Sequence, residues 1–180
     1  MTSAPEHNDL TTWLQAHLST LYEPPATADD ADFQASFNST FSPSAQIIVN
    51  HQMSSLDQFK DNLLSSKAAM TRATVHWKEV MQVDSPSEKS GIVAGFFVVT
   101  RTMKFRIRAS PAQNNGYNSF SAKIDQDPGA PSAAEDNWRI TQLFLTTENK
   151  AAQIHLKSAA EPFDTATVNP SLIEQTHGVV

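Results

Sequence analysis

The chain has 180 residues, a length that suits one domain with short tails. Hydrophobic residues make up 39% of it and charged residues 18%, so it can fill a core, and wholesale disorder is excluded. Because there is no cysteine, disulfides, thiolate metal sites and cysteine nucleophiles are excluded as well.

The formal net charge of −6 is unevenly distributed, because seven acidic residues and no lysine or arginine precede Lys60. An acidic first third argues against nucleic-acid binding. No apolar run has the length of a membrane span, and the N-terminus lacks the basic start of a secretory signal. We therefore expect a cytoplasmic protein that contacts neither nucleic acid nor membrane.

Three helices are predicted in the first third of the chain, over residues 8–22, from about 28 to 41, and over 56–69. Apolar residues recur there every three or four positions, and prolines follow the first two helices. The acidic run that opens the second helix lies where the helix dipole favours negative charge. We interpret it as a helix start rather than a metal site; it consists of Asp29, Asp30 and Asp32.

The rest of the chain predicts β-structure. A short strand over 45–51 precedes the third helix, and alternating or continuous apolar residues predict long strands over 72–83, 92–107, 117–125 and 138–147. Gly95 within the second long strand indicates a bend or a bulge. We expect a loop over 111–116 and a short helix over 148–158. Segregated helices and antiparallel strands define an α+β fold.

Several segments in this order carry a family resemblance. They are the helix Leu10–Leu21, the helix with Phe33 and Phe37, the strand Ile47–His51 leading into Leu56–Leu64, the segment Thr74–Val80 and the closing strand Trp138–Leu143. The chain resembles the nuclear transport factor 2-like superfamily, in its SnoaL-like branch, over residues 8–155. We divide it into a tail (1–7), one domain (8–157) and a second tail (158–180).

The resemblance implies three N-terminal helices packed in a strongly curved antiparallel sheet, cone-shaped as in NTF2-like and cystatin-like folds, with a short C-terminal helix and tail. It also implies a hydrophobic pocket for a small apolar or carbonyl-containing molecule, and a homodimer formed through the sheet. Members include isomerases, dehydratases, polyketide cyclases and non-catalytic binding or dimerising domains, so the fold does not choose among these functions.

Alternate residues of a strand point to the same side and are called a phase here. In two of the predicted long strands, one charged residue interrupts a phase that is otherwise apolar. Glu79 shares the phase of Val75 and Trp77, and Arg101 shares the phase of Phe97. If the Trp77 phase faces the helices, as we expect, Glu79 lies inside and His76 outside; in the opposite case His76 lines the pocket. An inward Glu79 either pairs with Arg101 across neighbouring strands or serves as a general acid or base.

The catalytic candidates are therefore His51, Glu79 and Arg101, with His51 at the end of the short strand. A single histidine in the long strands departs from the histidine pair of dehydratase-type members. No glycine-rich phosphate loop or histidine-rich metal motif appears, so we expect no cofactor and no metal. The predicted pocket residues are Trp13, Phe33, Phe37, Phe59, His76, Trp77, Phe97 and Trp138.

Two functions remain open from the sequence. The first is a non-catalytic small-molecule-binding or dimerisation module. The second is a cofactor-independent enzyme of cyclase, isomerase or dehydratase type, which would act on a small carbonyl compound by acid/base catalysis.

Overall fold

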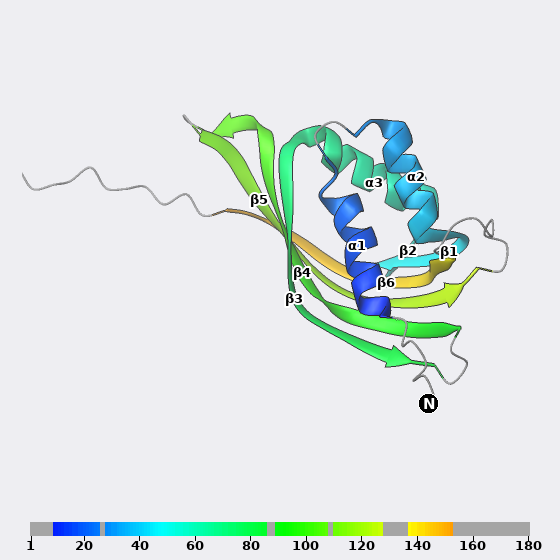
Figure 1. Cartoon of the computed structure of the whole chain (residues 1–180). Helices are drawn as coiled ribbons and strands as arrows, with labels where there is room; N and C mark the ends of the chain where they lie inside the picture. Colours follow the sequence, from blue (N-terminus) through cyan, green and yellow to red (C-terminus); the bar gives the residue numbers. More distant parts are fainter. Residues whose placement is uncertain (1–8, 26–27, 86–88, 108–109, 128–136, 153–180) are drawn as a thin grey trace, which may run out of the picture.

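The computed structural model describes residues 9–25, 28–85, 89–107, 110–127 and 137–152. Three helices lie on one face of a curved six-stranded sheet, whose strands follow the spatial order β2-β1-β6-β5-β4-β3 (Figure 1). The elements are α1 (Leu10–Tyr22), α2 (Asp30–Thr40), β1 (Phe41–Val49), β2 (Gln52–Ser54), α3 (Leu56–Ala69), β3 (Met70–Asp84), β4 (Ser90–Ile107), β5 (Ser110–Gln126) and β6 (Trp138–Ala151). The predicted α+β class and the three N-terminal helices are confirmed.

Each helix begins at a side chain that caps its free backbone amides. Asp9 accepts a hydrogen bond from the Thr12 amide at 3.1 Å, and Ser55 accepts one from the Gln58 amide at 3.1 Å. Asp29 and Asp32 form a reciprocal capping box at the start of α2. The acidic run is thus a helix start, as the sequence predicts.

The sheet departs from the sequence prediction in three places. β1 and β6 are parallel, so the sheet is mixed rather than wholly antiparallel. The predicted loop 111–116 belongs to β5, and residues 148–151 of the predicted final helix belong to β6, because Asn114 pairs with Ala151 and Asn115 with Lys150. This pairing satisfies the backbone of polar residues that have little strand propensity of their own. Residues 153–158 of that predicted helix and the 158–180 tail lie outside the described residues.

A β-bulge in β3 changes which side chains face the helices. Trp77 pairs with Phe97, but Glu79 pairs with Phe96, so Lys78 is the extra residue. The bulge lies beside Gly95, where an added Cβ would come within 2.3 Å of the Glu79 carbonyl oxygen. The bend or bulge that Gly95 indicates is confirmed, although the extra residue lies on the neighbouring strand.

Aromatic rings fill the space between α1 and the inner face of the sheet, which is the face that the helices cover. Phe97 is 1% exposed, and its ring centroid lies 5.2 Å from Tyr22, 4.8 Å from Trp77 and 5.8 Å from Phe120. The Trp77 indole also donates a hydrogen bond to Ser19 on α1 at 3.0 Å. These contacts fix α1 over β3 and β4.

Strand β3 lies at one edge of the sheet. The residue that ends α1 accepts a hydrogen bond from one of the backbone amides along this edge. The Val75 amide donates to the Glu23 carboxylate at 2.9 Å. We expect Glu23→Ala to lower the free energy of unfolding by about 1 kcal/mol, because the amide loses a charged acceptor. Urea denaturation measures this loss. Glu23→Gln keeps an acceptor oxygen and should lose less; equal losses in both variants would contradict the role of this bond.

Candidate functional site

The three catalytic candidates do not come together. His51 is exposed in the turn between β1 and β2, with a positive φ of 64°. Glu79 is exposed on β3, and β2 and β3 are the two opposite edges of the sheet. The prediction of an inward Glu79 is wrong, because the bulge at Lys78 turns it to the outer face. Its predicted pairing with Arg101 is also wrong, because Arg101 lies on the inner face.

Most of the predicted pocket aromatics are core residues. Phe33, Phe37, Phe59, Phe97 and Trp138 are each 9% exposed or less. Trp77 is half-buried in the same cluster, and Trp13 stacks on His17 at 4.3 Å between ring centroids. His76 is exposed on the outer face, which agrees with the expected strand phase and contradicts a place in an inner pocket.

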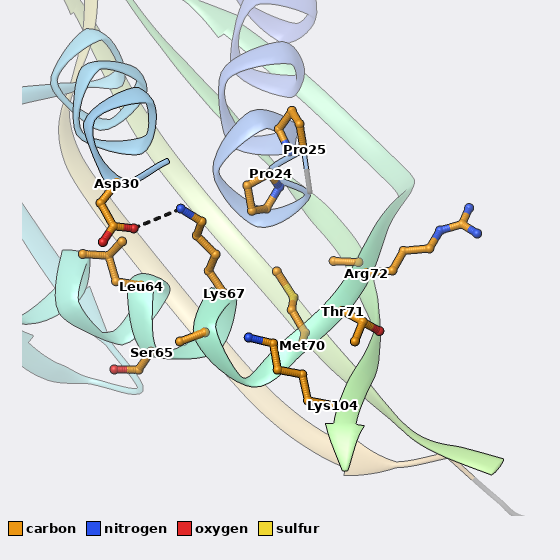
Figure 2. Close-up of a pocket in the computed structure, with 12 residues that line it drawn as sticks. Pro24, Pro25, Asp30, Leu64, Ser65, Lys67, Met70, Thr71, Arg72 and Lys104 are labelled. Atoms are coloured by element: carbon orange, nitrogen blue, oxygen red, sulfur yellow. Dashed lines mark hydrogen bonds and ion pairs between the residues drawn. The ribbon is translucent and has the colours of Figure 1, made fainter. Parts of the chain in front are cut away.

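Among the clefts formed by described residues, one of about 620 Å³ lies beside the start of β3. It lies between the end of α3, the Pro24-Pro25 segment and Lys104 of β4, and the ion pair of Lys67 with Asp30 crosses it at 3.1 Å (Figure 2). None of the predicted site residues lines it. Phe33 and Phe37 instead line two smaller hollows, one beside α2 and one between α2, β1 and α3.

Arg101 lies on the inner face of β4, in the phase that the sequence predicts. Its Nη1 donates to Asn149 Oδ1 of β6 at 3.1 Å. Burial lowers the pKa of its guanidinium, and the nearby Tyr22 opposes that shift. Neighbouring Asn114 has a buried Oδ1 atom without a hydrogen-bond partner. Together these groups make a polar site at the end of the aromatic cluster.

The Tyr22 phenol should titrate at unusually high pH. Burial raises its pKa to about 12, against a smaller opposing effect of Arg101. Since the unfolded chain releases this proton near pH 10 while the folded protein holds it, the stability contributed is present below about pH 10 and lost as the pH rises toward 12. In Tyr117→Phe, Tyr22 is the only tyrosine of the chain. The absorbance of tyrosinate should then appear with a midpoint near 12; a midpoint near 10 would contradict burial of this ring.

The outer face of the sheet, turned away from the helices, carries an apolar strip. Residues that pair with one another across neighbouring strands form a row over all six strands. In this row the side chains of Met53, Phe144 and Met81 are 70%, 44% and 63% exposed. We call this set the outer row. From β2 to β3 it consists of Met53, Ile48, Phe144, Ser121, Ala94 and Met81. The next row adds Val83 (59% exposed) and Ile92 (44% exposed). Sequence reasoning missed this surface because Met81 and Val83 share the alternation of Val75 and Trp77, which was expected to face the helices.

Charges on the outer face of β5 and β6 are paired locally. Lys123 lies 3.3 Å from Asp125, and Lys150 lies 3.1 Å from Glu148. The Asp125 carboxyl is partly desolvated, which raises its pKa, but hydrogen bonds from Thr141 and Ser90 and the Lys123 charge bring the net pKa below its usual value. These two strands therefore present little net charge around the outer row.

Two other kinds of feature are absent from the described ranges. No three histidine or carboxylate side chains there are close enough together to hold a metal ion. No helix in the described part of the chain has both the length and the apolar character that crossing a membrane requires.

Comparisons with known proteins show the fold. No protein-family model and no curated protein sequence matches the chain. Solved structures do match: a candidate scytalone dehydratase from Novosphingobium aromaticivorans has a TM-score of 0.57 at 10% identity, covering 84% of this chain and 93% of its own. The S. rosetta CaMKII hub has a TM-score of 0.54 at 9% identity, covering 83% and 100%.

A third match is the Candida albicans Mtr2–Mex67 M domain complex, with a TM-score of 0.54 at 14% identity, covering 84% of this chain and 99% of that one. All three are NTF2-like folds, so the chain has the NTF2-like fold that its sequence resembles. The first of these structures is described as a candidate dehydratase, the second as a hub and the third as a protein complex. The fold alone does not choose among these functions.

Proposed function

We propose that this chain is a non-catalytic association module that forms a homodimer through the outer face of its sheet. The observation that carries the proposal is the outer row, which crosses every strand and exposes Met53, Phe144 and Met81, with only Ser121 polar among its members. Contiguous exposed apolar surface of this kind is typical of protein interfaces.

The shape of the outer row supports self-association. Phe144 is bulky, whereas its neighbours Ser121 and Ala94 on β5 and β4 are small. In a two-fold interface each surface meets its own copy, so a two-fold axis near β5 would place each Phe144 ring over the small residues of the other copy. The locally paired charges of β5 and β6 would add little repulsion between two such faces.

The interior of the cone supports a non-catalytic role. The aromatic cluster around Phe97 fills the space between α1 and the sheet, and it includes the predicted pocket residues Trp77 and Phe97. His51 and Glu79 lie at opposite edges of the sheet, which leaves acid/base catalysis by this pair without a shared site. The hub and complex-forming proteins with the same fold agree with an association role.

The test is the molar mass of the purified chain in solution, measured by light scattering and sedimentation over the micromolar range. We expect twice the chain mass of 19.7 kDa. A monomer throughout that range would overturn the proposal.

A further inference from the structure

Arg101 is a half-buried cation without a counter-charge among the residues that the structure describes. Its only hydrogen bond to the described residues is to the neutral amide of Asn149, and none of their carboxylates pairs with it. Taking a charge partly out of water without a charged partner is costly, and proteins rarely keep such a group unless something else binds it. Nothing in the proposed dimer uses it, because Arg101 lies on the face opposite the outer row.

The backbone around Arg101 is shaped to hold its guanidinium group. Gly116 of β5 lies beneath it, and an added Cβ would come within 2.6 Å of Arg101 Nη1 and 2.9 Å of Asn149 Oδ1. Any larger side chain at Gly116 would therefore push the guanidinium away. The glycine and Asn149 fix one side of the group, while its remaining N–H donors have no acceptor among the described residues.

Two further polar side chains near Arg101 make no hydrogen bond through their side chains to the described residues. The Tyr22 hydroxyl makes no hydrogen bond to the described residues, although Tyr22 is close enough to Arg101 for each to alter the pKa of the other. Asn114 is the cross-strand partner of Arg101, and its side-chain amide makes no hydrogen bond in the described part of the chain. Three elements, α1, β4 and β5, thus direct unused hydrogen-bonding groups to one place.

We propose that these groups bind the carboxylate of a small organic acid. A guanidinium fork matches a carboxylate with two parallel hydrogen bonds, and the Tyr22 hydroxyl supplies a further donor. The walls of the site are apolar: Val99 is fully buried, Ala73 faces Arg101 across the strands, and Met103 follows on the same face. These walls favour an acid with an organic body over a free inorganic ion.

The large cleft of Figure 2 lies next to this site. Ala73, the cross-strand partner of Arg101, also lines that cleft, together with Met70 and Pro24. The organic body of the acid has apolar surface available on that side, while the carboxylate binds Arg101.

The test uses the full chain and a panel of acetate, benzoate and phenylacetate, followed by calorimetry and by NMR of the arginine side-chain Nε–H signals. At least one acid should bind and shift one arginine signal. In Arg101→Gln its affinity should fall about tenfold or more, because a charge-assisted pair is lost. Arg106→Gln is the matched control: it removes the same charge from an exposed position of the same strand and should leave binding unchanged.

Two further measurements separate a ligand site from a structural arginine. Without ligand, Arg101→Gln should melt at or above the temperature of the unaltered chain, since it removes an uncompensated charge. Gly116→Ala should keep all the polar groups but weaken acid binding, because it displaces the guanidinium. Benzamide, the uncharged counterpart of benzoate, should not bind.

The outcomes that overturn the proposal are specific. They are no binding of any acid in the panel, equal binding by the unaltered chain and Arg101→Gln, and a melting temperature of Arg101→Gln several degrees below that of the unaltered chain. Inorganic phosphate binding as tightly as the best organic acid would overturn the role of the apolar walls. A monomeric protein would leave this proposal standing, because the two surfaces lie on opposite faces of the sheet.

Discussion

Phe97→Ala is expected to lower the free energy of unfolding by about 3–5 kcal/mol, the range typical of a buried phenylalanine replaced by alanine. Phe97 is 1% exposed and touches Tyr22, Trp77 and Phe120, which come from α1, β3 and β5. Its removal leaves a cavity where helix and sheet meet, and three rings lose a shared neighbour. Urea denaturation, followed by tryptophan fluorescence, measures the loss.

Phe96→Ala is the matched control for this prediction. Phe96 is the adjacent residue of β4 but points to the outer face, where it is half-buried and stacks near Tyr117 with 6.5 Å between ring centroids. Less apolar area is lost there, so we expect a loss of about 1 kcal/mol at the same protein concentration. A larger loss in Phe96→Ala than in Phe97→Ala would contradict the assignment of the two sheet faces.

The helices and the inner face of β4 could be predicted from the sequence. The period of three to four apolar residues marked α1 and α3 to within two residues, because one face of each helix is buried and the other is not. Arg101 was placed correctly on the phase of Phe97, because no bulge interrupts β4 between these two residues. The order of the elements was enough to indicate the NTF2-like fold.

The place of Glu79 could not be predicted from alternation in β3 alone. The bulge at Lys78 moves each later residue to the other face, and this shift was hidden because apolar residues continue in the same phase at Met81 and Val83. Apolar side chains there looked like core, since the sequence does not distinguish a core from an exposed apolar strip. The signal that could have revealed the shift is Gly95, which makes room for the bulged carbonyl.

Phe144→Glu is expected to convert the proposed dimer into a monomer. In a two-fold interface the substitution places a carboxylate from each copy in the outer row, where association removes it from water and the nearby Lys123 is already paired with Asp125. Burying an uncompensated charge costs about 3 kcal/mol or more, which corresponds to a dissociation constant raised at least about 100-fold. Sedimentation velocity should then report a single monomeric species at concentrations where the unaltered chain is dimeric.

Ala35→Glu controls for the added charge. Ala35 is exposed on α2, on the helical side of the molecule, so the same net charge is gained far from the outer row (Figure 1). We expect it to remain dimeric, and both variants to keep the circular dichroism spectrum of the unaltered chain because both sites are solvent-exposed. A dimeric Phe144→Glu would place the interface elsewhere. If Ala35→Glu dissociates as readily, general charge repulsion rather than the apolar strip controls association, because only Phe144 belongs to the row that crosses the sheet.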